Sequence, residues 1–199
     1  VAREWFICSS LFLLLFGLLH FVAFIASAVL AGVGYEYWDG KAMSEDIPIN
    51  YERMRDLICT AENTLYSYRN AVIAECDGRI AACMISYSGD NYLEYRENVS
   101  TAMGWDSVPE EFGTEVEPGE YYLDTLAAHP DFRGRGIGAG LLKKTAENHK
   151  CENPCLIVET GHDKVIELYE SLGFCKTDIH VSLFGTDYMK MYYRPDGLK

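Results

Sequence analysis

Two arginines and three glycines alternate in the segment Arg133 to Ala139, which reads Arg-Gly-Arg-Gly-Ile-Gly-Ala. An apolar run before it ends at Pro130, and a helical pattern with Leu141 and Leu142 on its apolar side follows. A strand, a glycine-rich loop and a helix in this order present backbone N–H groups to a phosphate at the helix N-terminus. Arginine side chains add bidentate, positively charged donors. The segment therefore predicts a phosphate-binding loop in a chain of net charge −13.

A second group of residues surrounds Tyr169. The segment Asp163 to Leu172 carries its apolar residues at the spacing of one helix face, and Gly173 suits the position that ends a helix. Phe174 then begins a strand. A tyrosine on such a helix has two interpretations: a core aromatic with a polar end, or a proton donor in a reaction.

Two further interpretations of the glycine-rich loop are open from its residues alone. One is a glycine-rich surface turn, which explains neither the strand before it nor the helix after it. The other is a dinucleotide-binding loop, because Gly134, Gly136 and Ala139 satisfy Gly-x-Gly-x-x-Gly/Ala. Glu159 follows about 20 residues later, where a ribose-binding acid is expected. A P-loop is excluded, because no Gly-Lys-Ser/Thr follows the glycines.

The loop resembles motif A of the GNAT superfamily of N-acetyltransferases. That motif, Arg/Gln-x-x-Gly-x-Gly/Ala, is matched by Arg133, Gly136 and Gly138. A helix that ends in Leu-Tyr-Glu-x-x-Gly-Phe is the second hallmark of the superfamily, and Leu168 to Phe174 matches it. The resemblance extends over roughly Asn70 to Tyr193.

The resemblance implies where acetyl-CoA, the acetyl donor, binds. Its pyrophosphate is expected on the loop and its pantetheine along the backbone of the preceding strand. The pyrophosphate-binding residues are then Arg133, Gly134, Arg135, Gly136, Ile137, Gly138 and Ala139, and the pantetheine-binding residues are Leu126, Ala127 and Ala128. His162 stands where many members of the superfamily carry a cofactor-binding asparagine, so it is included as a cofactor-binding candidate.

The resemblance also implies the catalytic groups. Tyr169 is expected to protonate the departing CoA thiolate, and Asp124 is the candidate general base because some members use a carboxylate from the central strand. Glu120 shares the strand face of Asp124 by the two-residue period and is the alternative base. The implied reaction is transfer of an acetyl group to a primary amine by direct attack in a ternary complex. A non-catalytic acyl-CoA-binding module and a dinucleotide-dependent oxidoreductase are the alternatives.

The composition argues against one class of partner and favours another. A pI of about 4.7 argues against nucleic acid, because phosphate backbones are bound by basic patches. The same charge favours a cationic or neutral acceptor, either a small amine or a peptidyl amine. The seven cysteines are scattered, which is typical of reduced thiols in a cytoplasmic protein, and no Cys/His cluster completes a metal site. The sequence leaves a homodimer open.

The elements that position these residues predict one α+β domain over residues 1–199, with a mixed α/β arrangement. The GNAT fold implies a twisted, mostly antiparallel sheet of about six or seven strands flanked by about four helices. We expect helices at Tyr51–Leu65 and Leu141–His149, a hairpin of Asn70–Cys76 and Arg79–Tyr87 around Asp77-Gly78, strands at Glu120–Ala128 and Leu156–Thr160, and a closing antiparallel pair of Phe174–Phe184 and Tyr188–Tyr193. The segment Asp90 to Gly119 is expected to be a solvated acidic loop that could help form the acceptor site.

The first 35 residues are strongly apolar, and residues 6–33 contain no Asp, Glu, Lys or Arg. That length is enough to span a bilayer, and the pattern of Arg3, an apolar core and Ala26-Ser-Ala28 also fits a signal peptide. The GNAT comparison favours a buried first strand and helix here instead. We therefore expect a cytoplasmic protein, with membrane contact through residues 6–33 as the less favoured alternative.

Overall fold

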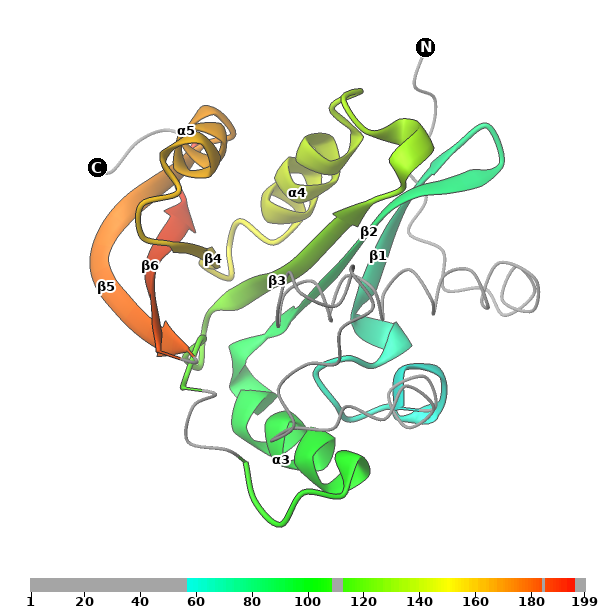
Figure 1. Ribbon diagram of the computed structural model, residues 1–199, viewed down its shortest axis with the longest axis vertical. Helices are drawn as coiled ribbons and strands as arrows, with labels where there is room; N and C mark the ends of the chain where they lie inside the picture. Colours follow the sequence, from blue (N-terminus) through cyan, green and yellow to red (C-terminus); the bar gives the residue numbers. More distant parts are fainter. Residues whose placement is uncertain (1–56, 109–112, 184, 196–199) are drawn as a thin grey trace.

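The computed structural model describes residues 57–108, 113–183 and 185–195. The strands are β1 (Ala71–Cys76), β2 (Arg79–Ser88), β3 (Tyr121–Ala128), β4 (Pro154–Glu159), β5 (Phe174–Leu183) and β6 (Thr186–Tyr193) (Figure 1). The α-helices are α3 (Tyr92–Met103), α4 (Ile137–Asn148) and α5 (Asp163–Ser171), joined by short 3₁₀ turns at η2 (Tyr68–Asn70), η3 (Gly89–Asn91) and η5 (Pro130–Phe132). Residues 57–60 form the end of a further helix.

The six strands form one sheet in the order β1-β2-β3-β4-β6-β5. Four of the five neighbouring pairs are antiparallel, and only β3 and β4 run parallel. The mixed, mostly antiparallel sheet expected from the sequence is therefore confirmed. The closing pair of β5 and β6 and the hairpin of β1 and β2 are also where they were predicted. Asp77 and Gly78 turn that hairpin with φ of +54° and +73°, as a two-residue hairpin turn requires.

The parallel pair is short, and this shapes the centre of the sheet. Tyr121 pairs with Pro154 and Tyr122 with Cys155, and no later residue of β3 pairs with β4. On its other side β3 stays paired with β2 as far as Ala128. The two central strands therefore separate after Tyr122, and the edge of β3 that faces β4 carries no ladder from Leu123 onward.

A β-bulge interrupts β3 at Asp124. Ser86 of β2 pairs with Leu123 and Ile85 pairs with Thr125, so Asp124 is the extra residue between them. A bulge places two successive side chains opposite one partner and shifts the in–out alternation by one residue. Asp124 keeps the alternation of Tyr122 and points to the α3 side, and the bulge shifts the residues after it, so that Leu126 and Ala128 lie beside Gly138 of α4.

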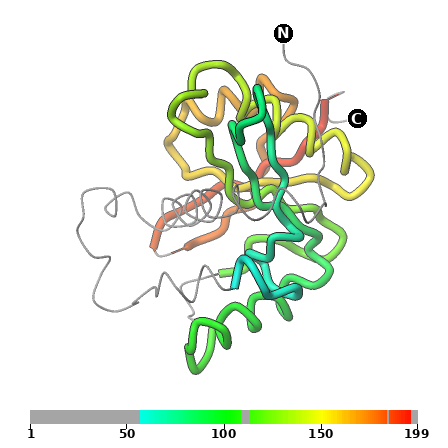
Figure 2. Tube along the Cα trace, turned by 90° about the vertical axis from the view of Figure 1, so that its right-hand side faces the viewer, coloured from blue at the N-terminus to red at the C-terminus, as the bar shows by residue number. Residues whose placement is uncertain are grey.

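Each face of the sheet packs against its own apolar core. α4 and α5 lie on one face, and α3 lies on the other (Figures 1 and 2). The core under α4 and α5 includes Leu123, Leu141, Leu142, Ile166 and Phe174. The core on the α3 side is rich in tyrosine and includes Tyr87, Tyr92, Tyr122, Val99 and Met103. Hydroxyl groups therefore enter the second core, and these need hydrogen-bond partners there.

Two expectations about the elements were wrong. The acidic segment from Asp90 to Gly119 contains α3, because Tyr92, Val99 and Met103 form a helical apolar stripe that packs on the sheet, while Glu94 and Glu97 of the same helix stay exposed. Gly104 ends this helix with φ of +78°. The helix expected to reach Leu65 ends at Thr60, and residues 51–56 lie outside the described part of the chain. Residues 6–33 also lie outside it. Among the described residues, no helix is both long and apolar enough to cross a membrane.

Candidate active site

The glycine-rich loop connects β3 to α4, as the sequence predicted. Gly134 and Gly136 have φ of +71° and +73°, a conformation that side chains other than glycine rarely adopt. Gly136 is the N-cap of α4, and no side chain caps the helix there. The backbone N–H groups of the first turn are therefore left for an outside acceptor. Around Gly134 and Gly136, space for a Cβ is empty out to 4 Å, so a ligand can approach the backbone closely.

The start of α4 lies directly against the unpaired end of β3. A Cβ placed on Gly138 would stand 3.7 Å from the Leu126 side chain and 3.9 Å from that of Ala128. Leu126 is 37% exposed although it belongs to a central strand, because β4 does not cover it. The loop amides and the free edge of β3 at Leu126–Ala128 therefore adjoin. One elongated ligand with an anionic end can contact both.

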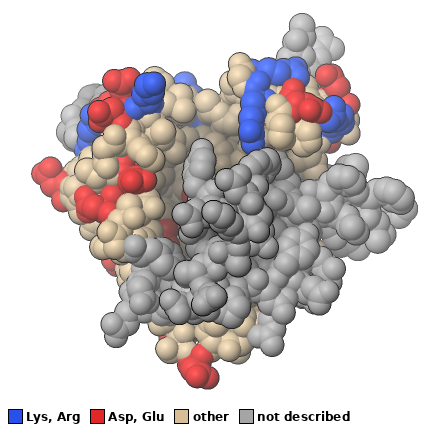
Figure 3. Space-filling view, viewed as in Figure 1, with Lys and Arg blue, Asp and Glu red and all other residues tan. Residues whose placement is uncertain are grey.

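Lys and Arg side chains lie at the upper right of Figure 3, with acidic side chains among them. The Arg133 Nε donates to the Ala128 carbonyl at 3.2 Å, which holds the side chain beside the end of β3. Arg135 lies over the Phe132 ring at 5.3 Å from its centroid and reaches the Cys76 sulfur at 3.6 Å. Both arginines predicted to bind pyrophosphate therefore flank the loop.

Arg79, at the start of β2, was missed by sequence reasoning. Its guanidinium carbon lies 4.9 Å from the centroid of the Phe132 ring, and its Nη2 donates to the Asp131 carboxylate at 2.7 Å. Its position in the hairpin, 52 residues before Asp131, carried no signal of this neighbourhood. The tertiary fold therefore adds a third guanidinium to the two that the loop contains.

Tyr169 and His162 lie at opposite ends of α5. Tyr169 packs against the core under α4 and α5, with its ring 6.1 Å from that of Phe174. Burial raises the pKa of its hydroxyl, so the group stays protonated at neutral pH. His162 is the N-cap of α5, and its side chain is 60% exposed with Nδ1 3.6 Å from the Glu159 carboxylate. The cofactor role of His162 and the catalytic role of Tyr169 stay predictions.

Asp124 is the extra residue of the bulge, and its side chain points into the tyrosine-rich core. Its carboxylate accepts hydrogen bonds from the Tyr87 hydroxyl and the Thr125 hydroxyl, each at 3.1 Å. Burial raises the pKa of Asp124 to about 6, against the effect of these two hydrogen bonds. A carboxylate with a pKa this near neutral is a better proton acceptor than a solvated aspartate. Its base role, which the resemblance suggested, stays a prediction.

Glu115 is a second carboxylate on the same side of the sheet, and sequence reasoning did not single it out. It accepts a hydrogen bond from Tyr122 at 2.6 Å and a longer one from Tyr92 at 3.5 Å. Burial, and then the charge of Asp124, raise the pKa of Glu115 to about 7. In the sequence it is one of eight acidic residues in a segment interpreted as a solvated loop, and nothing separated it from the others.

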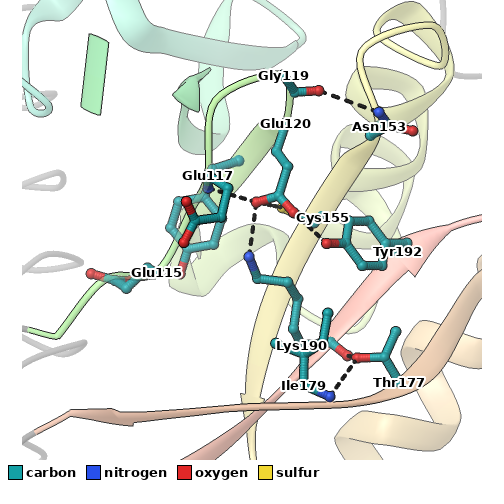
Figure 4. Close-up of polar contacts among 11 residues, drawn as sticks. Glu115, Glu117, Gly119, Glu120, Asn153, Cys155, Thr177, Ile179, Lys190 and Tyr192 are labelled. Carbon is teal, nitrogen blue, oxygen red and sulfur yellow. Dashed lines mark hydrogen bonds and ion pairs between the residues drawn. The ribbon is translucent and has the colours of Figure 1, made fainter. Parts of the chain in front are cut away.

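Glu120, the alternative base, is fully engaged elsewhere. Its carboxylate accepts hydrogen bonds from the Lys190 ammonium at 2.8 Å and from the Tyr192 hydroxyl (Figure 4). Lys190 is 3% exposed and Glu120 8% exposed. Burial raises the pKa of Glu120, but the contacts with Lys190 and Tyr192 outweigh it and bring the pKa below its usual value. Glu120 is therefore an ionised structural group at the closed end of the β3–β4 pair.

No group of His, Cys, Asp and Glu side chains within the described ranges is arranged to hold a metal ion.

Residues 35–174 match the model of the acetyltransferase (GNAT) family. N-alpha-acetyltransferase RimI of Mycobacterium tuberculosis is 31% identical over 80 residues, which are 40% of this chain and 45% of that protein. The thialysine N-epsilon-acetyltransferase of Sus scrofa is 36% identical over 55 residues, 26% of this chain and 32% of that protein. The matched parts span less than half the length of these relatives.

Among solved structures, an N-acetyltransferase from Staphylococcus aureus Mu50 superposes with a TM-score of 0.66 at 26% identity. That alignment covers 84% of this chain and 92% of the other. Together with the family match over residues 35–174, these findings show that the chain belongs to the acetyltransferase (GNAT) family, a family of acyltransferases.

Proposed function

We propose that this protein is an N-acetyltransferase that moves an acetyl group from acetyl-CoA to a primary amine by direct attack in a ternary complex. The observation that carries the proposal is the uncapped start of α4, which adjoins the unpaired edge of β3. A molecule with a pyrophosphate and an amide-containing arm fits these two features together. Acetyl-CoA is such a molecule. Because acetyl-CoA is an intracellular cosubstrate, its proposed use also supports a cytoplasmic location for the protein.

The residues of the site would divide the work as follows. The loop amides and Arg133 and Arg135 hold the pyrophosphate, and the edge of β3 at Leu126–Ala128 holds the arm that carries the thioester. Fixing the thioester beside the acceptor supplies much of the rate, because the attack becomes effectively intramolecular. When the C–S bond breaks, Tyr169 gives its proton to the thiolate that leaves.

The acceptor must lose a proton before it attacks, because an ammonium group has no free electron pair. Asp124 is the proposed base, since its raised pKa and its position in the bulge suit it to accept this proton. A primary amine that approaches as a cation also agrees with the two carboxylates on this side of the sheet. Among the relatives, one is named for an α-amine and the other for an ε-amine, so both kinds of amine belong in a test.

The test is calorimetric titration of the full chain with acetyl-CoA, with NADH and NADPH as controls. We expect acetyl-CoA to bind and the two nicotinamide dinucleotides to give no heat. A panel of thialysine, lysine, spermidine and a peptide with a free N-terminal alanine then tests turnover through release of the CoA thiol. Binding without turnover of any amine would favour the non-catalytic acyl-CoA module. Binding of a nicotinamide dinucleotide in place of acetyl-CoA would favour the oxidoreductase.

A further inference from the structure

Three tyrosines lie in the core that contains the two carboxylates on the α3 side of the sheet. Tyr87 donates to Asp124 and Tyr122 donates to Glu115, and the rings of these tyrosines lie in tilted contact at 5.8 Å between centroids. Tyr66 packs against the same core, where burial, and then the charges of Asp124 and Glu115, raise the pKa of its hydroxyl. Two hydrogen-bonded pairs, Tyr87 with Asp124 and Tyr122 with Glu115, therefore meet through their tyrosine rings, although the carboxylates come from a strand bulge and from a loop.

Little positive charge compensates this pair within the described part of the chain. No Lys, Arg or His nitrogen lies within ion-pair distance of either carboxylate there, whereas Lys190 neutralises Glu120 on the same face. Arg96 affects Glu115 from a longer distance, with its guanidinium over the Tyr92 ring and bonded to the Gly113 carbonyl. The titratable and charged groups that face the pair are Tyr66 before β1, Tyr87 on β2, Tyr92 and Arg96 on α3, Tyr122 on β3 and Tyr188 on β6.

We propose that Glu115 is a positioning residue of the acetyltransferase, acting through Asp124: the two carboxylates work as one pair, and the negative charge on Glu115 strengthens Asp124 as the acceptor of the amine's proton. This inference rests on the proposed function for its catalytic meaning. The pairing itself is a property of the protein without substrates and can be measured on its own.

Electrostatic linkage gives the direction of the effect. A proton placed on Asp124 removes its repulsion with ionised Glu115, so ionised Glu115 raises the proton affinity of Asp124. The proton balance closes. One proton passes from the ammonium group to the pair and later to solvent, and the neutral amine attacks the thioester carbonyl. The second N–H proton leaves as the C–N bond forms and the C–S bond breaks, and the thiolate takes up one proton in exchange.

The pairing is tested by following side-chain carboxyl carbons by NMR against pH in the ¹³C-labelled full chain. We compare the natural protein with Asp124→Asn, Glu115→Gln and Glu117→Gln. Glu117 lies two residues from Glu115 and is exposed, so its variant is the matched control. We expect Asp124→Asn to move the Glu115 midpoint to lower pH by about one unit, the coupling typical of paired groups. We expect Glu117→Gln to leave it in place. If the pH midpoint of Glu115 were the same in Asp124→Asn as in the natural protein, the pairing would be overturned.

The catalytic meaning is tested by kcat/KM for the best amine of the panel against pH. Glutamine still accepts the Tyr122 hydrogen bond but carries no charge. Glu115→Gln should therefore equal the natural protein below about pH 6 and fall behind by up to about tenfold above about pH 7, where Glu115 is ionised. A deficit of equal size at every pH would make Glu115 merely structural and overturn the inference. If the natural protein turns over no amine, the proposed function fails and the positioning role fails with it, while the NMR result still decides the pairing.

Should Glu115→Gln fail to fold, Tyr122→Phe replaces it. This change removes the 2.6 Å hydrogen bond that lowers the pKa of Glu115, so the Glu115 midpoint should move to higher pH. An unchanged midpoint in this variant would also count against the pairing.

Discussion

Two carboxyl groups four residues apart, Glu120 just before β3 and Asp124 within it, face the same side of the sheet and have opposite electrostatic properties. Glu120 is sealed in an ion pair with Lys190, and its pKa is lowered. Asp124 has only hydroxyl donors among the described residues, with Glu115 as a second carboxylate nearby, and its pKa is raised. Burial alone therefore does not distinguish an ionised structural carboxylate from one whose raised pKa suits it to accept a proton. The charge of its partner does.

The sharpest test of this comparison is Asp124→Asn against Glu120→Gln. The first change removes the proposed base and keeps an acceptor for the Tyr87 hydroxyl, so kcat should fall by about 100- to 10,000-fold. Glu120→Gln should cost stability and leave kcat of the folded protein within a few-fold of normal. Steady-state kinetics with thermal unfolding of each variant checks both. Equal losses of kcat in the two variants would erase the distinction between the two carboxylates.

Lys190→Met tests whether the ion pair with Glu120 stabilises the fold. It leaves the Glu120 carboxylate buried without its cation, and breaking a buried pair in this way costs about 3 to 5 kcal/mol of unfolding free energy. Urea unfolding measures it. Lys176→Met is the control, because the pair of Lys176 with Glu170 is about half exposed and should cost less than about 1 kcal/mol. The double variant Glu120→Gln/Lys190→Met should recover part of the loss, and no recovery would mean that the ion pair is not the cause.

Tyr169→Phe tests whether a hydroxyl on α5, on the face of the sheet opposite Asp124, donates a proton in the reaction. Loss of a proton donor to the thiolate should lower kcat by about 100-fold while acetyl-CoA affinity changes little, because the donor acts in the transition state. Kinetics and calorimetry on the same preparation separate the two quantities. The ring still packs against Phe174 in this variant, so unchanged kcat would return Tyr169 to a packing role.

Gly136→Val tests the cofactor corner without touching either carboxylate. Valine at φ of +73° strains the loop, and we expect acetyl-CoA affinity to fall about ten- to hundredfold. Gly185→Val is the matched control, since Gly185 has φ of +77° and an equally open Cβ position in the turn between β5 and β6. Calorimetry should show loss of binding only for the first variant, and parallel losses would mean general strain.

The smallest expected effect is on stability against pH. Because the folded pKa values of Asp124 and Glu115 are raised, the folded protein holds more protons than the unfolded chain between about pH 4 and pH 7. Stability from these groups is therefore present at low pH and is lost as pH rises through the folded pKa values. The variant Asp124→Asn/Glu115→Gln should be stabilised relative to the natural protein by about 1 to 2 kcal/mol more at pH 8 than at pH 5. Urea unfolding at the two pH values measures this difference, and an equal gain at both would contradict the assignment.

Much of the fold was predictable because its signals are local. Asp77-Gly78 turned a hairpin, and the helix of Tyr169 ended at Ser171, with Gly173 at the left-handed position just after its C-cap. The helix α3 was missed because eight acidic residues in its segment outweighed an apolar stripe of Tyr92, Val99 and Met103. Charge counts describe what faces water, whereas the stripe decides whether a segment packs, so the second signal should have had precedence.

The candidate site divides in the same way. By itself, the sequence determined the strand, glycine loop and helix that build the proposed phosphate site, because those residues are contiguous and their backbone conformation depends on near neighbours. Only the tertiary structure decided which carboxylate is neutralised and which is not. Lys190 lies 70 residues from Glu120 along the chain, and Tyr87 lies 37 from Asp124. A pKa depends on charges and burial within a few ångströms in space, and no local pattern records which distant residue will stand there.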